Sequence, residues 1–314
     1  MIRVALVGTG KMGTYHARLA AAHDTIEIVA YVDINTPSDE LMALAPQAIH
    51  ATDLAQVIDL CDAVIIASPT PTHYAIACIA LAAQKHVLIE KPITLDAAQA
   101  RDLFAQAHAY NGVVQVGHVE RYNPAFVTAQ SLIDGPIRMI RSTRSGPYHP
   151  RVGNDSVVMD LMIHDIDLML LLLHAPPTTV QALASSHKSM QPDTALAQLA
   201  WSTGTVATVA AHRGAMTSRR EMIIETDTQQ LYVDFGARTV QITDAKGERT
   251  MPADNSNPLN EQLCDFVNAI QAGVGAVRAA HDMDTVATTL MIAEKAAATA
   301  HPLPRTRHAV QSRA

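Results

Sequence analysis

The stretch that decides the fold is residues 2–13, which read IRVALVGTGKMG. The apolar run predicts a short strand, and the residues after it have helical spacing. The glycines form a G-x-G-x-x-G, in which the first permits a tight turn, the second lets the backbone approach a pyrophosphate, and the third lets helix and strand pack closely. N–H groups at the start of the helix favour an anion there. We therefore predict a dinucleotide site that includes Gly8, Gly10, Lys11, Met12 and Gly13.

Asp33 supports this reading and bears on the cofactor. It follows a second predicted strand at 27–32, about twenty residues after Gly13, where a carboxylate can accept hydrogen bonds from the adenosine ribose. A glycine turn with a surface aspartate is the plainer alternative. A 2′-phosphate would be repelled by Asp33 and needs a nearby cation, but the next Lys or Arg is Lys85. The sequence therefore favours NAD over NADP.

The rest of the first third repeats the alternation of strand and helix. Helices are expected at 72–84 and 95–109, and strands at 63–67, 86–89 and 113–116. Short apolar strands separated by helices are typical of a parallel sheet covered on both faces. We expect an α/β Rossmann domain with a doubly wound parallel sheet over residues 1–118.

The pattern changes after Gly117. We expect a helix at 124–133, a strand at 137–143, a loop at 145–155 and one long apolar helix at 159–173. Strands of period two follow at 180–184, 195–201, 206–211, 221–225, 231–235 and 239–243, and helices near 259–272 and 283–300 close the chain. This pattern predicts an α+β domain over 119–301 with a largely antiparallel, open-faced sheet for substrate binding and oligomerisation. Residues 302–314 are expected to be a poorly ordered tail.

Composition limits the classes of partner. The chain has 314 residues, more than one core usually supports, and a net charge of −7, which disfavours nucleic acid and anionic membranes. A phosphate-bearing small molecule remains compatible with it. The three cysteines form no CxxC pair, and no stretch reaches the ~18 uninterrupted apolar residues of a membrane helix. We expect a soluble, cytoplasmic protein.

Glu90-Lys91-Pro92 ends an apolar strand, at the sheet edge where ligands bind in open α/β folds. A lysine there can hydrogen-bond a substrate hydroxyl, and burial beside a cation could lower its pKa enough for proton transfer. A solvated ion pair at a strand end is the alternative.

Together with the glycine fingerprint, three further segments resemble the Gfo/Idh/MocA oxidoreductases. They are Ser68-Pro69-Thr70-Pro71-Thr72-His73, Lys85-His86-Val87-Leu88-Ile89-Glu90-Lys91-Pro92 and Asp160-x-x-x-His164. The resemblance implies an NAD-dependent dehydrogenase of sugars or polyols. It places Thr70, His73 and Glu90, with Ser68 and His118, beside the NAD, and Lys91 between nicotinamide and substrate.

Asp160, His164 and Asp167 share one face of a predicted helix by their spacing. A histidine with a carboxylate one turn away can be held in one tautomer and exchange a proton. The resemblance makes Asp160, His164 and Lys91 the catalytic group, without deciding which of Lys91 and His164 takes the proton. A helix face satisfied by buried hydrogen bonds is the structural alternative.

A metal site is another reading of five residues: His118, His149, Asp160, His164 and Asp165. No His-x-x-x-His or cysteine pair supports it, and hydride transfer to NAD needs no metal. We therefore expect no metal.

Residues 117–124 and 146–151 resemble the versions in family members that oxidise UDP-N-acetylglucosamine at C3. Arg121 and Arg151 offer planar forks suited to a pyrophosphate, and Tyr148 can stack on a sugar or base. Either arginine could instead be structural. The resemblance implies oxidation of UDP-N-acetylglucosamine at C3 to the 3-keto sugar nucleotide, as a step toward amino-sugar, lipid A or surface glycan synthesis. We expect the enzyme to be a homodimer or homotetramer. A dehydrogenase of a free sugar or inositol, and a non-catalytic NAD(H)-binding regulator, are the alternatives.

Overall fold

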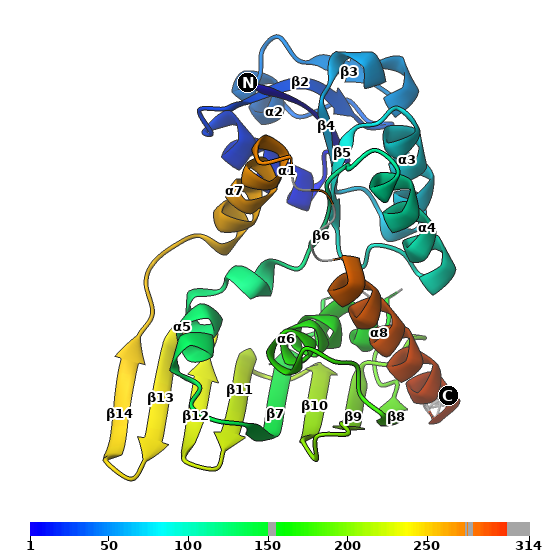
Figure 1. The fold of residues 1–314 in the computed structure, drawn as a ribbon. Coiled ribbons are helices and arrows are strands. Elements are labelled where there is room, and N and C mark those ends of the chain that lie inside the picture. The colour runs from blue at the N-terminus through cyan, green and yellow to red at the C-terminus, as the bar shows by residue number, and fades with distance from the viewer. Residues whose placement is uncertain (150–154, 274, 276–278, 300–314) are drawn as a thin grey trace, which may run out of the picture.

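The computed structural model describes residues 1–149, 155–273, 275 and 279–299. Figure 1 shows two sheets, with the N-terminal one stacked end-on above a broader C-terminal one. None of the helices in these ranges is both long and apolar enough to cross a membrane.

The first sheet has six parallel strands in the order β3-β2-β1-β4-β5-β6. The strands are β1 (Ile2–Val7), β2 (Ile26–Val32), β3 (Ile49–Ala51), β4 (Ala63–Ile66), β5 (His86–Glu90) and β6 (Val114–Gly117). The helices are α1 (Lys11–Ala21), α2 (Asp39–Leu44), α3 (Thr70–Ala82) and α4 (Ala97–His108). Separate apolar clusters occupy its two faces, which confirms the doubly wound fold.

Two short elements of this domain were not predicted. β3 has only three residues, two of them exposed, so it carries no apolar period. α2 has six residues and begins after Ser38, whose hydroxyl accepts the N–H of Leu41 as a helix cap. Neither is long enough for periodicity to reveal it.

The second sheet has eight strands in the order β14-β13-β12-β11-β7-β10-β9-β8. The strands are β7 (Ile137–Gly146), β8 (Thr179–Ser185), β9 (Thr194–Ala200), β10 (Val206–Arg213), β11 (Arg219–Thr226), β12 (Gln229–Asp234), β13 (Thr239–Asp244) and β14 (Gly247–Pro252). Every neighbouring pair is antiparallel except β7 and β10, so the largely antiparallel prediction is confirmed. β14 escaped prediction because it is exposed along its whole length and lacks apolar alternation.

Helices α5 (Pro124–Leu132), α6 (Ile163–Leu173) and α8 (Ala279–Thr299) lie over one side of the second sheet (Figure 1). The predicted helix at 159–173 consists of two segments: the π-helix η5 (Val158–Met162) leads directly into the α-helix α6. The short 3₁₀ turn η3 (Val119–Tyr122) connects the two sheets.

Helix α7 (Pro258–Gln271) follows the second sheet in sequence but packs on the first. Leu263, Phe266 and Val267 belong to the apolar cluster that contains Val4 and Leu6 of β1. The chain therefore returns to the nucleotide domain before it forms α8, and by packing α7 belongs with residues 1–118.

Candidate active site

The glycine turn has the geometry that a pyrophosphate needs. Gly8 has φ +91°, and a Cβ there would lie 2.5 Å from the Ser68 nitrogen. A Cβ at Gly13 would lie 1.8 Å from the Gly8 oxygen, so helix and strand meet too closely for a side chain. Gly10 caps α1 without a side-chain hydrogen bond and faces open space, which leaves the helix N–H groups accessible to an anion. Lys11 and Met12 form the first turn of α1.

A cleft of about 560 Å³ adjoins this turn and is lined by Gly8, Asp33, Ser68, Thr72 and apolar side chains such as Ile76. The Asp33 carboxylate accepts the Thr9 N–H at 2.7 Å and the Asn35 N–H at 2.9 Å. Burial opposes ionisation of Asp33, but these hydrogen bonds lower its pKa. An ionised acceptor beside a largely apolar cleft fits the adenosine half of a dinucleotide.

His73 braces this cleft from inside the protein. Its Nε2 lies 2.8 Å from the Ser68 oxygen and its Nδ1 lies 3.0 Å from the Pro92 oxygen. The side chain is buried, and burial lowers its pKa. Its contacts connect the loop before α3, which begins at Thr70, to the loop after β5. A neutral imidazole has one N–H, so His73 donates to one of these carbonyl oxygens and contacts the other, and it thereby joins the two loops.

Glu90 lies at the carboxyl end of β5, between α1 and β6. Its Oε1 lies 2.8 Å from Nε2 of the buried His16. A Cβ at Gly117 would lie 2.9 Å from Glu90 Oε2, so the glycine makes room for this carboxylate. The following residue, Lys91, is thereby aimed from the edge of the sheet toward the second domain.

Lys91 meets Asp160 across the two domains. Lys91 Nζ donates to the main-chain oxygen of Asp160 at 2.7 Å and to its Oδ1 at 3.4 Å. The other carboxylate oxygen of Asp160 lies 3.9 Å from a guanidinium nitrogen of Arg213. The side chains of Lys91 and Asp160 are partly exposed, whereas Arg213 is buried. The pair is accessible to a ligand on one side and fixed on the other.

His164 lies beside this pair. Its Nδ1 is buried and has no hydrogen-bond partner within the described ranges. Burial, followed by the positive charges of Lys91 and Arg144, keeps the pKa of His164 well below its ordinary value of 6.5. The imidazole is therefore neutral at pH 7 and able to accept a proton.

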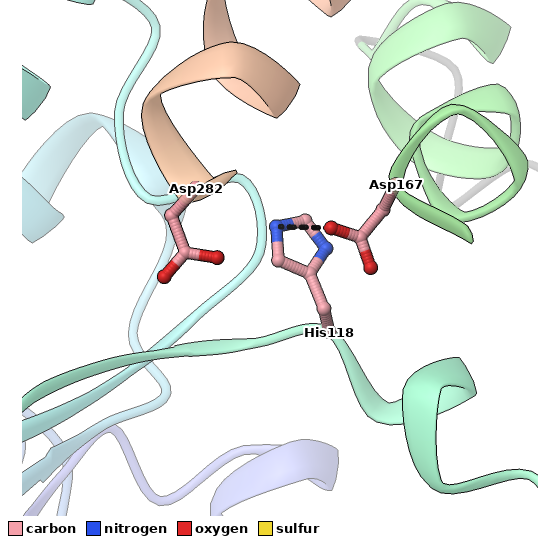
Figure 2. A group of neighbouring side chains, drawn as sticks. All are labelled: His118, Asp167 and Asp282. Carbon is pink, nitrogen blue, oxygen red and sulfur yellow. Dashed lines mark ion pairs between the residues drawn. The ribbon is translucent and has the colours of Figure 1, made fainter. Parts of the chain in front are cut away.

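Behind His164 lies a buried charge cluster, drawn in part in Figure 2. His118 directly follows β6, and Asp167 and Asp282 lie on α6 and α8. The His118 ring points at the Asp167 carboxylate, 3.9 Å away. Burial lowers the pKa of His118 to about 3. Arg121 donates to both Asp167 oxygens, at 2.8 and 2.6 Å, and also to Asp282.

This cluster bears on the metal reading. Single ligand atoms of His118, Asp167 and Asp282 lie within 4.8 Å of one another. Both carboxylates, however, already bind the Arg121 guanidinium, which supplies the positive charge that a metal ion would bring. Two residues of that alternative metal reading lie elsewhere: Asp165 is buried against Arg144, and His149 is exposed.

The predicted substrate residues Arg121, Tyr148 and Arg151 differ in what the structure shows of them. Arg121 is buried, and its guanidinium joins α6 to α8, so it does not offer a fork to a pyrophosphate, contrary to the sequence interpretation. Asp167 binds Arg121 instead of facing the site with Asp160. Asp160 lies in the π-helix η5 that precedes α6, so the α-helical spacing assumed from the sequence does not hold across the two segments. Tyr148 is half-buried just after β7, and Arg151 lies outside the described residues.

Sequence reasoning missed three arginines that contribute to the site, Arg144, Arg213 and Arg220. Each occupies a position where the alternation of its strand predicts a core side chain, as after Val209 and Ala211 in β10. A charged residue at a core position near a strand end was the available signal. Sequence reasoning also missed Glu120, whose carboxylate accepts hydrogen bonds from both Arg144 and Arg220.

Both domains of the chain match models of a known family. Residues 2–118 match the model of the oxidoreductase family with an NAD-binding Rossmann fold, and residues 126–232 match the GFO/IDH/MocA C-terminal domain. The chain is 34% identical over 283 residues to the UDP-N-acetylglucosamine 3-dehydrogenase of Acidithiobacillus ferrooxidans, covering 86% of this chain and 89% of that protein. It is 29% identical to an inositol 2-dehydrogenase of Rhizobium meliloti, covering 59% of this chain and 58% of that protein.

A solved structure of the same Acidithiobacillus dehydrogenase superposes with a TM-score of 0.88 at 31% identity, covering 95% of this chain and 98% of that one. The likeness extends over both domains. The protein belongs to the Gfo/Idh/MocA family of NAD-dependent oxidoreductases, which act on CH–OH groups.

Proposed function

We propose that this enzyme oxidises the C3 hydroxyl of UDP-N-acetylglucosamine to the 3-keto sugar nucleotide. The observation that carries the proposal is the meeting of Lys91, Asp160 and His164 at the edge of β5, beside a cleft that fits a dinucleotide. The choice of sugar nucleotide is supported by the dehydrogenase that is 34% identical over most of both chains.

The proposed cofactor residues follow from the contacts around the glycine turn. Gly8, Gly10 and Gly13, with Lys11 and Met12, receive the pyrophosphate, and Asp33 accepts the ribose hydroxyls. We assign Ser68, Thr70, Glu90 and His118 to the nicotinamide end, with His73 held against the Ser68 carbonyl and His16 against Glu90. Bound NAD⁺ supplies the hydride acceptor for the carbon that is oxidised.

Lys91 and His164 handle the hydroxyl proton. The hydroxyl oxygen gives up a proton as its carbon gives up a hydride, and a neutral imidazole can accept that proton. Lys91 donates a hydrogen bond to the same oxygen, or takes the proton in its neutral form. Asp160 holds the ammonium in place through its main-chain and carboxylate oxygens.

The product chemistry suggests its next step. A 3-keto group is a substrate for transamination, so the enzyme would supply a 3-amino sugar for lipid A or another surface glycan. The exposed apolar side chains Leu183, Leu196 and Val206 on β8, β9 and β10 favour a homodimer or homotetramer. Light scattering on the purified protein tests that assembly.

The test is NADH formation, followed by absorbance, with NAD⁺ and a panel of UDP-N-acetylglucosamine, UDP-glucose, free N-acetylglucosamine and myo-inositol. We expect NADH with the acetylated sugar nucleotide and a 3-keto product by NMR. Turnover of inositol without turnover of UDP-sugars would instead favour the chemistry of the 29% identical relative. Tight NADH binding without turnover of any sugar would indicate a regulator.

A further inference from the structure

Three arginines form a row at the end of the second sheet that faces the nucleotide domain. Arg213 ends β10 and pairs in register with Gly146 of β7, and Arg144 of β7 pairs with Arg220 of β11. All three share the sheet face of the core residues of their strands, such as Val209 and Met222. We call this set the arginine row.

The exposure of the arginine row changes along its length. The side chains of Arg213 and Arg144 are 3% and 5% exposed, whereas that of Arg220 is 46% exposed. Arg144 binds two carboxylates, Glu120 at 3.0 Å and Asp165 at 3.0 Å. The first two members are thus enclosed and paired, and a ligand can reach only the third.

The exposed side chain of Arg220 is oriented by a hydrogen bond to Glu120. Its Nη1 lies 3.3 Å from Oε1 of Glu120, the same oxygen that Arg144 contacts. Glu120 is buried, so it fixes one corner of the guanidinium. Within the described ranges no other residue takes a hydrogen bond from this side chain, which leaves the remaining donors of the fork for a ligand.

Short contacts connect Arg220 to the catalytic group. Arg220 meets Glu120, Glu120 meets Arg144, and Arg144 meets Asp165, which directly follows His164. The positive charge of Arg144 also helps to lower the pKa of the His164 imidazole. Arg220, on β11, is therefore linked through these ion pairs to Asp165, the neighbour of His164 on α6. An exposed guanidinium in this position suits a substrate that extends past the oxidised sugar.

We propose that Arg220, oriented by Glu120, binds the diphosphate of the sugar nucleotide. The assignment rests on the proposed function and gives Arg220 the task that sequence reasoning gave to Arg121. A guanidinium donates two parallel hydrogen bonds to phosphate oxygens, and one that is already oriented loses less entropy on binding. Arg220 thereby selects nucleotide-linked sugars over free ones.

The experiment compares Arg220→Ala and Arg220→Lys with Arg219→Ala as a matched control. Arg219 is the preceding residue, 65% exposed, and it lies on the opposite face of β11, with Glu221 at 3.6 Å. The measured quantities are kcat and KM for UDP-N-acetylglucosamine, the Kd values of UDP, uridine and NADH, and the thermal midpoint.

We expect Arg220→Ala to raise KM for the sugar nucleotide and the Kd of UDP about 10–100-fold, the range of a charge-assisted hydrogen bond. The Kd of uridine and NADH should stay within about threefold, and Arg220→Lys should recover part of the loss because it keeps the charge without the fork. Arg219→Ala should match wild type.

Two other outcomes separate this inference from the proposed function. If wild type oxidises UDP-N-acetylglucosamine and Arg220→Ala binds UDP as well as Arg219→Ala does, the diphosphate assignment is overturned and the function stands. If wild type binds UDP through Arg220 but forms no NADH, the diphosphate site stands and the oxidation is overturned. Absence of UDP binding by wild type overturns the diphosphate site.

Discussion

Lys91 Nζ lies 2.7 Å from the main-chain oxygen of Asp160, although the two residues are 69 positions apart and belong to different domains. This contact joins the carboxyl edge of the parallel sheet, just after β5, to η5 of the second domain. It also holds the ammonium in one place, through the main-chain oxygen and Oδ1 of Asp160. The distance between these two residues is the main geometric requirement of the proposed chemistry.

Replacing Lys91 by alanine should lower kcat by at least about 10², because a positioned proton-transfer or hydrogen-bonding group is lost from the transition state. The Kd of NADH should stay within about threefold. Lys85→Ala is the control, since Lys85 immediately precedes the other end of β5. Steady-state kinetics and NADH fluorescence titration measure both quantities. Wild-type turnover in Lys91→Ala would remove this lysine from the chemistry.

His164→Asn should also lower kcat by at least about 10², with NADH binding retained. The pKa of His164 is well below 6.5, chiefly because the ring is buried, so the active neutral form persists as the pH falls through 6.5. Proton uptake, and the loss of activity that it causes, should therefore occur only at lower pH. A pH–rate profile measures this.

The control for His164 lies on the same helix. His174 is exposed at the C-terminal end of α6, and His174→Asn makes the same change there. Its profile should coincide with that of wild type. An acid limb centred at or above pH 6.5 in wild type, absent from His164→Asn, would mean that the histidine has an ordinary pKa and that the buried geometry is not the active one.

Local patterns predicted the fold well because the core strands and helices carry strong periods. The strand at 206–211 and the helix at 124–133 each have an apolar face that burial then confirms. β14 and β3 have no such face and were missed. The placement of α7 was also beyond local pattern, since its apolar stripe fits either core and only the tertiary path decides.

The sequence could predict only those candidate site residues that stand in a recognisable motif. Lys91, Asp160 and His164 stand in recognisable segments. The position of the Arg121 side chain, however, is set by its hydrogen bonds to Asp167, 46 positions away, and to Asp282, 161 positions away. An arginine in a cleft loop has the same local sequence whether it binds a phosphate or two buried carboxylates. Only the long-range pairing distinguishes the two.

Asp33→Ala should raise the Kd of NADH about tenfold and narrow the preference for NADH over NADPH. Hydrogen bonds from Thr9 and Asn35 lower the pKa of Asp33, and an ionised carboxylate there would accept hydrogen bonds from the ribose and repel a 2′-phosphate. Fluorescence titration with each cofactor measures the ratio. Glu27→Ala, an exposed carboxylate at the start of β2, is the control. An unchanged ratio in Asp33→Ala would contradict the ribose contact.

Arg121→Ala should destabilise the fold without weakening substrate binding by the folded enzyme. Asp167 and Asp282 are buried, and Arg121 keeps the pKa of Asp167 well below its usual range even though burial opposes this. Removing the guanidinium leaves both carboxylates without their main cation, which costs about 3–5 kcal/mol of unfolding free energy. Urea unfolding measures the loss.

The control for Arg121 is Arg141→Ala, which breaks the exposed pair with Glu225 and should cost at most about 1 kcal/mol. Arg121→Lys keeps one positive charge between the two aspartates and should be less damaging than alanine, so the series remains informative if Arg121→Ala fails to fold. KM for the sugar nucleotide, taken per folded molecule, should not change in any of these variants. Unaltered stability together with a raised KM in Arg121→Lys would show that this guanidinium turns toward the substrate, and the diphosphate would then have to be shared between Arg121 and Arg220.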